Sequence, residues 1–171
     1  MRNLFLIATL LLTLCAFNTN AQDVKIAHVN YLEVIDSLPS KLLADKEIQK
    51  FLEDGQKTIT DMELELENQI NTYLEEKETL SVIMQELREK QIQEQSQIIE
   101  LKRQTLQQDL EILNARMYDP IEQNLKKAID MVAERHNVTY VIDESMLLYV
   151  SGGLDLTEEV KAEMMKMETG G

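Results

Sequence analysis

Apolar residues recur every three or four positions over most of the chain, from about Ser40 to His136, in a run with one glycine, Gly55, and one proline, Pro120. The run is rich in Glu, Gln, Lys and Leu, which lose little side-chain freedom in a helix. A single straight helix of this length would measure roughly 145 Å at about 1.5 Å per residue. Two antiparallel arms are more plausible, so the pattern predicts a long helical hairpin.

The two arms are expected at 41–78 and 82–117, nearly equal in length and each reaching roughly 55 Å at about 1.5 Å per residue. Ser81 can cap the second helix by accepting a hydrogen bond from an early amide. The many glutamines of the second arm predict a looser seam than an ideal coiled coil. The predicted stripe of the first arm is Ile59, Met62, Leu66, Ile70 and Tyr73, and that of the second begins as Ile98, Leu101 and Thr105 and continues after a shift as Leu106, Leu110, Leu113 and Met117.

Two residues interrupt this pattern. Pro120 is expected to kink the chain back towards the base of the hairpin, because proline cannot donate a helical hydrogen bond. Gly55 costs about 1 kcal/mol relative to Ala inside a helix. It marks a bend, a close contact between the arms, or merely a tolerated exposed position.

Strand patterns lie at both ends of the chain. Branched residues at 24–30, 139–143 and 147–150 predict three short strands. A short helical turn is expected at 31–38 and a last helix from Leu156 to about Met167. We therefore predict an α+β fold, in which N- and C-terminal strands form a small β-structure at the base of a long antiparallel helical hairpin. The expected organisation is a base of 22–40 and 118–171 and an arm of 41–117 with its tip near 79–82.

Residues 1–21 are expected to be a secretion signal, with Arg2 as the positive start, an apolar stretch over 4–17, and Ala21 before the cut. A transmembrane anchor is the alternative, although the stretch is shorter than the ~20 residues that a bilayer needs. Lipid attachment at Cys15 is a second alternative, but Leu14 precedes it where a small residue is expected. Cleavage after Ala21 would leave an exported chain without cysteine.

The chain is strongly acidic. Without residues 1–21 it has 16 Lys and Arg against 31 Asp and Glu, a net charge of −15. Nucleic acid is not an expected partner, because phosphate neutralisation needs Lys and Arg. Direct binding to anionic lipid is doubtful for the same reason. Few residues remain outside the hairpin to build a large private core, which suggests that self-association supplies the missing burial.

No pattern of catalytic or metal-ligating residues is visible. Apart from the predicted signal, the chain has two histidines, His28 and His136, and no cysteine, whereas a metal site needs more ligands at defined spacing. Phosphate-binding loops, nucleophile elbows and HExxH motifs are missing from the sequence. We therefore expect no enzymatic activity, no cofactor and no metal, and we look for function on the surface of the arms.

The layout resembles the Skp/OmpH family of periplasmic chaperones for outer-membrane proteins. Order and spacing carry the resemblance rather than any single motif. The matching segments are residues 25–30, the Gln- and Glu-rich helical insert, Asp119-Pro120-Ile121, Ala128-Ile129, Val132-Ala133, 140–143 and 153–160.

This resemblance implies a jellyfish-like homotrimer in the periplasm, with strands in a central base and hairpins projecting around a cavity. Unfolded outer-membrane proteins would be held there without ATP. Well-studied members are basic, and this chain departs from them. The acidic arms would attract cationic client segments, and lipopolysaccharide binding is in doubt.

Apolar strand residues would carry the shared base, and partly exposed arm residues would contact clients. The alternative is that these arm residues only pack between the two arms and hold them together. A coiled-coil structural or adaptor protein that binds one fixed envelope partner is the competing function. The oligomerisation candidates are Ile26, Val29, Val141, Ile142, Leu147 and Tyr149, and the client-binding candidates are Met62, Ile70, Tyr73, Ile83 and Met84.

Overall fold

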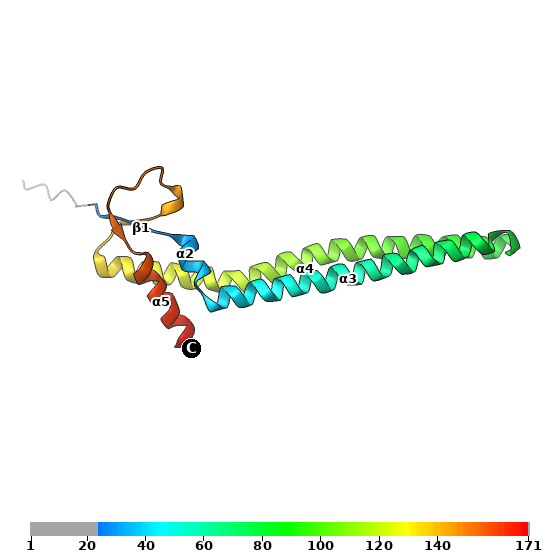
Figure 1. The fold of residues 1–171 in the computed structure, drawn as a ribbon, viewed down its shortest axis with the longest axis horizontal. Coiled ribbons are helices and arrows are strands. Elements are labelled where there is room, and N and C mark those ends of the chain that lie inside the picture. Colours follow the sequence, from blue (N-terminus) through cyan, green and yellow to red (C-terminus); the bar gives the residue numbers. More distant parts are fainter. Residues whose placement is uncertain (1–23, 171) are drawn as a thin grey trace, which may run out of the picture.

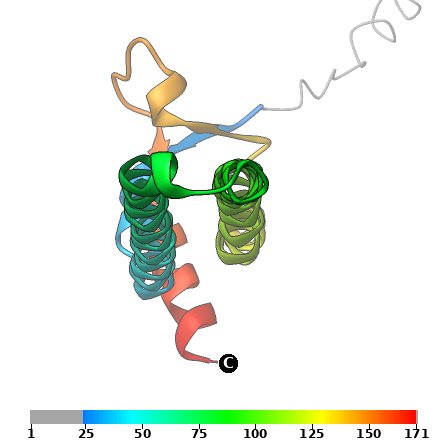
Figure 2. The same cartoon turned by 90° about the vertical axis from the view of Figure 1, so that its right-hand side faces the viewer.

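A computed structural model describes residues 24–170 and shows a long helical hairpin that projects from a small base (Figure 1). The predicted secretion signal lies outside the described residues. Helices α3 (Pro39–Glu76) and α4 (Val82–His136) form the hairpin and lie side by side along its length, as the end-on view also shows (Figure 2). The base combines strands β1 (Ile26–Val29), β2 (Tyr140–Asp143) and β3 (Leu154–Asp155) with helices α2 (Tyr31–Asp36) and α5 (Thr157–Thr169). The predicted α+β architecture is confirmed.

The helix ends follow local signals in the sequence. Pro39 occupies the first turn of α3, where its missing N–H costs nothing. The chain reverses through a short 3₁₀ turn, η1 (Lys77–Thr79), and the Ser81 hydroxyl then accepts a hydrogen bond from the Met84 amide at 3.4 Å. The prediction that Ser81 caps the second helix is confirmed. At the other end of α4, Asn137 adopts a left-handed conformation with φ 54° and ends the helix.

Pro120 does not break the hairpin, and this corrects the expectation of an interruption there. Helix α4 runs without a break from Val82 to His136 with Pro120 inside it. Pro120 and Arg116 are both exposed, so water can solvate the Arg116 carbonyl that loses its helical donor. Beyond the proline, Ile121, Leu125 and Val132 are buried in the base and hold that part of α4 in place.

The sheet joins the two ends of the chain. Its order is β2-β1-β3, and β1 pairs in parallel with both neighbours. The predicted strand at 147–150 is wrong, because those residues form no strand and Tyr149 is 81% exposed. Asp143 instead caps a 3₁₀ turn, η2 (Glu144–Met146), and the chain loops out before β3. Positive φ angles at Gly152 and Gly153, 95° and 115°, let it return to β1.

The core of the molecule lies in the base. One face of β1, α2, the C-terminal part of α4 and α5 enclose a cluster of 13 buried residues. Its largest fully buried side chains are Leu38, Leu156, Met164, Val34, Val132 and Val160. The far part of the hairpin has only a small second cluster of Ile59, Ile99 and Leu106. The arms therefore depend on the base for their position.

Candidate functional site

In the seam between the arms, α3 uses the apolar stripe that was predicted, whereas the stripe of α4 begins at a different residue from the predicted one. Ile59 and Tyr73 of α3 are buried against α4, but Ile98 and Leu101 are 50% and 62% exposed. The predicted start of the second stripe is therefore wrong. Ile99 and Leu106, seven residues apart, face α3 instead. Spacing back from Leu106 by one heptad would have found Ile99.

Gly55 is a point of close contact between the arms. A methyl group at this position would overlap the end of the Leu106 side chain, which lies directly over the glycine. Of the three alternatives for Gly55, the close contact is therefore the one that the structure contains. The missing side chain lets Leu106 reach the backbone of α3, where Phe51 and Ile59 pack around it.

The effect of Gly55→Ala on stability is expected to depend on the residue that position 55 faces. Alone, the substitution gains about 1 kcal/mol of helix propensity and loses it again to the overlap with Leu106. In a Leu106→Ala background the space is free, so Gly55→Ala should stabilise the arms by about 1 kcal/mol. Urea unfolding followed by circular dichroism measures both, with Gln56→Ala as an exposed control. Equal effects of Gly55→Ala in the two backgrounds would contradict the contact.

The candidate client-binding residues fall into two groups. Met62, Ile70 and Tyr73 lie between the arms, where the first two are half-buried and Tyr73 is buried. Ile83 and Met84 lie at the start of α4, next to the reversal, and are 77% and 38% exposed. The structure thus places apolar side chains both in the seam and openly at the tip.

A polar cluster holds the arms together near the tip. The Tyr73 hydroxyl donates to the Glu89 carboxylate, and Lys77 Nζ lies 3.3 Å from Glu89 Oε1 and 5.2 Å from the centre of the Tyr73 ring. The hydrogen bond from Tyr73 and then that from Lys77 lower the pKa of Glu89, which favours its charged form. Tyr73 is therefore a residue that fastens α3 to α4 as well as an apolar surface.

Sequence reasoning missed several exposed apolar side chains of the arms. Outside the seam, α3 and α4 carry large apolar residues that no other described residue covers. A count of apolar positions off the main stripe could have found them, since each lies one or two residues from a seam position. They are Leu42, Leu43, Leu52, Leu64, Leu74, Val82, Leu87 and Ile112, and Ile98 and Leu101, which were expected in the seam, are exposed as well.

In the base, the alternation of the strands separates the oligomerisation candidates. Val29 is buried in the core, and Val141 packs against that core. Ile26 pairs with Tyr140, and His28 pairs with Ile142. Because strand side chains alternate between faces, these four residues share the opposite face of the sheet. Ile26 and Tyr140 are exposed on it, and Ile142 is half-buried.

The remaining oligomerisation candidates, Leu147 and Tyr149, lie in the loop between η2 and β3. Leu147 is half-buried and Tyr149 is exposed. His28 lies beside the end of this loop, with its ring 3.5 Å from the position of a side chain on Gly153. Its Nδ1 atom is buried without a hydrogen-bond partner among the described residues. The open face of the sheet, η2 and this loop together expose Ile26, Tyr140, Met146, Leu148 and Tyr149.

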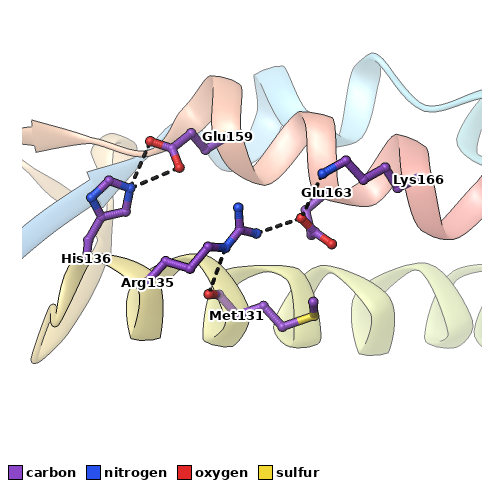
Figure 3. Close-up of polar contacts among 6 residues, drawn as sticks. All are labelled: Met131, Arg135, His136, Glu159, Glu163 and Lys166. Carbon is purple, nitrogen blue, oxygen red and sulfur yellow. Dashed lines mark hydrogen bonds and ion pairs between the residues drawn. The ribbon is translucent and has the colours of Figure 1, made fainter.

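Ion pairs fasten the last helix to the base (Figure 3). Arg135 of α4 donates to the buried Glu163 of α5 at 2.6 Å, and Lys166 approaches the same carboxylate at 3.4 Å. One turn away, His136 Nε2 lies 2.8 Å from Glu159 Oε1. The hydrogen bond from Arg135 lowers the pKa of Glu163, and the bond and charge of Lys166 lower it further.

Arg135→Gln is expected to weaken the base at neutral pH and to have less effect in acid. The lowered pKa of Glu163 means that its charged form stabilises the fold above the ordinary value of 4.5, and that this contribution is lost as pH falls through the lowered pKa. Without Arg135 that contribution is smaller. Thermal unfolding at pH 7 and at about pH 2, well below the ordinary pKa of a glutamate, measures the difference. This role of the pair would be contradicted if Arg135→Gln lowered thermal stability equally at both pH values. It would also be contradicted if the effect of Arg135→Gln were the same in a Glu163→Gln background.

A second polar cluster lies where the arms leave the base. Lys41 Nζ lies 2.7 Å from Asp45 Oδ2 and 3.2 Å from Asp36 Oδ1, which connects α3 to α2. The Tyr118 hydroxyl of α4 donates to Asp45. Hydrogen bonds to Asp45 and Asp36 raise the pKa of Lys41, and those from Lys41 and Tyr118 lower the pKa of Asp45. The cluster fixes the direction in which the hairpin leaves the base.

Two other kinds of site were sought in the part of the chain that the structure describes. Within residues 24–170, no three His, Cys, Asp or Glu side chains are grouped so that they could hold a metal ion. Among the described helices, none combines the length and the apolar character that crossing a bilayer requires.

Comparison with known proteins identifies the family. Residues 25–164 match the family described as outer membrane protein (OmpH-like), so the chain belongs to the OmpH-like family, which consists of chaperones and not of enzymes. A solved structure of a candidate outer membrane chaperone (OmpH-like) from Caulobacter crescentus has the same fold, with a TM-score of 0.73 and 16% sequence identity over 82% of this chain and 83% of that one. No curated protein matches the sequence significantly.

Proposed function

We propose that this protein is an ATP-independent holdase of the periplasm, which keeps unfolded outer-membrane proteins from aggregating. Membership of the OmpH-like family supports a chaperone role. The observation that carries the proposal is the set of exposed Leu, Ile and Val side chains on arms that project away from the base (Figure 1). Apolar surface of this kind on a projecting element is typical of a site that contacts other proteins.

The proposed mechanism is many weak contacts instead of one tight one. An unfolded barrel protein exposes alternating apolar side chains and unpaired strand edges, which aggregate. Each apolar contact with an arm residue contributes roughly 25 cal/mol per Å² buried. Scattered contacts such as Leu64, Leu101 and Ile83 hold a chain without fixing one conformation. The excess of acidic residues on the surface keeps the loaded complex soluble.

The proposal includes a homotrimer, in which three copies join their open sheet faces and leave a cavity between the arms. Ile26, Tyr140 and Ile142 would meet in the shared base, together with Leu147 and Tyr149 of the neighbouring loop. In a single copy most of these side chains face water. Mutual burial of such a face is the ordinary way in which exposed apolar strands are covered.

Light scattering during dilution of a denatured outer-membrane barrel protein from urea tests the function. Residues 22–171, added in excess, are expected to suppress the rise in scattering without any nucleotide. A rise equal to that with an inert acidic protein would refute a holdase. Recovery of one folded envelope protein from a pulldown, instead of many unfolded ones, would favour the adaptor alternative.

A further inference from the structure

An open apolar groove runs between the arms in the half of the hairpin that is nearer the tip. Two adjoining hollows of about 440 Å³ and 480 Å³ share the residues Leu66, Ile70 and Ser96, so they form one continuous depression. Leu74 of α3 and Ile92 and Ile99 of α4 complete its apolar lining. The depression arises in part because Ser96 is too small to fill the space beside Ile70, which leaves both isoleucines, Ile70 and Ile92, only half-buried.

The rim of the groove is acidic. Four carboxylates, Glu63, Glu67, Glu89 and Glu100, border it against a single cation, Arg103. Arg103 is already paired with Glu63 and Glu100, and Glu89 is held by Tyr73 and Lys77. Glu67 forms no ion pair or hydrogen bond with a described side chain. The groove therefore combines an apolar floor with an excess of negative charge around it.

We propose that this groove binds an extended peptide segment in which apolar residues alternate with Lys or Arg. The proposal rests on the proposed function and adds the kind of client segment that the arms prefer. From Glu63 to Leu74 the groove is about 16 Å long at about 1.5 Å per residue. An extended chain spans that distance with about five residues at about 3.3 Å each, and three of them can point to the floor.

The charge of the rim decides between possible segments. Apolar side chains of the segment enter beside Leu66, Ile70 and Ile92, while the long stems of intervening Lys or Arg residues reach the rim carboxylates. A segment with Glu at the same positions meets like charges and is disfavoured. The preference acts between exposed charges, so it weakens as salt rises.

Fluorescence anisotropy with two labelled peptides tests the groove. Both peptides alternate Val and Phe with a charged residue, which is Lys in one and Glu in the other. At low salt the Lys peptide is expected to bind about tenfold more tightly, and the difference should shrink to less than about threefold in 0.5 M salt. Equal affinities at low salt overturn the proposal.

Two substitutions locate the site. Glu67→Lys leaves the seam untouched and is expected to weaken binding of the Lys peptide about fivefold. Ile70→Ser removes part of the floor. Leu32→Ser, at a 60% exposed position of α2 in the base, is its control. Unchanged affinity in both Glu67→Lys and Ile70→Ser places binding elsewhere and overturns the proposal.

Suppression of barrel aggregation separates the groove from the holdase function. If these variants and the wild type still suppress barrel aggregation, the holdase function stands without the groove. If the wild type does not suppress it, the holdase function itself is refuted.

Discussion

Ile142→Asp is expected to dissociate the proposed trimer into single copies while each copy stays folded. The residue lies on the face of β2 that points away from the core of the subunit, opposite His28 in the register of the sheet. In the proposed trimer three such faces meet, so three carboxylates would be buried without partners. Burying one unpaired charge costs several kcal/mol, and this cost recurs in every copy.

Light scattering and sedimentation measure the result of Ile142→Asp. The mass in solution should fall to that of one copy, and the helical circular dichroism signal should remain. Ile142→Val, which keeps an apolar side chain, is the matched control and should preserve the mass. An unchanged mass for Ile142→Asp would mean that a different surface joins the copies.

Substitution of the neighbouring residue, Val141, by Asp is expected to impair folding instead of assembly. Val141 packs against the core of its own subunit, which includes Ala27, Val132 and Leu156. Val141→Asp should therefore lower the stability of the base itself, with loss of cooperative unfolding, whereas Ile142→Asp should not. Because successive side chains of a strand point to opposite faces of the sheet, adjacent positions affect folding and assembly separately.

The general architecture could be predicted because its signals are local and repeated. The hairpin follows from apolar stripes at helical spacing and from the cap at Ser81. The small sheet follows from the branched residues at both ends of the chain. Helix periodicity over long segments is the strongest pattern in a sequence. The resemblance to the OmpH-like family, which the comparisons support, came from the order of short segments around this insert.

The errors arise where tertiary packing overrides a local rule. Pro120 reads as an interruption, yet α4 continues through it, and residues beyond it are buried in the base. Residues 147–150 have the composition of a strand, but no neighbouring strand receives them, and the shorter Leu154–Asp155 segment takes the edge of β1. Ile98 and Ile99 are indistinguishable by type, and the heptad spacing back from Leu106, which the prediction did not apply, selects Ile99.

The pairs that no local pattern reveals are those between distant segments. Gly55 faces Leu106, Tyr73 meets Glu89, and Arg135 meets Glu163 across separate helices. Each depends on how two helices are aligned, which a single sequence does not specify. The groove between the arms follows from the same alignment, since Ser96 leaves a gap only because Ile70 lies beside it.

Shortening the arms is expected to abolish the holding of clients and to leave the base assembled. Removal of 59–72 from α3 and 92–105 from α4 takes away two heptads from each helix and keeps the helical phase close to that of the seam. Each arm becomes about 21 Å shorter at about 1.5 Å per residue. The groove residues Leu66, Ile70 and Ile92 disappear with the deleted segments.

The contacts at both ends of the shortened hairpin survive. Tyr73, Lys77 and Glu89 still fasten the tip, and Leu106 still lies over Gly55. The core of the base contains no deleted residue, because its hairpin members are Ala44, Ile121, Leu125, Ala128 and Val132. The variant should therefore keep the mass of the wild-type assembly in solution and a cooperative unfolding transition.

Suppression of barrel aggregation measures the functional loss. The shortened protein should act no better than an inert acidic protein at the same concentration, because it encloses a smaller space and lacks the groove together with the exposed Leu64, Ile98 and Leu101. Deleting a single heptad from each arm, 59–65 and 99–105, should give an intermediate effect. Full activity of the two-heptad variant would mean that clients are held at the base, and that the length of the hairpin serves another purpose.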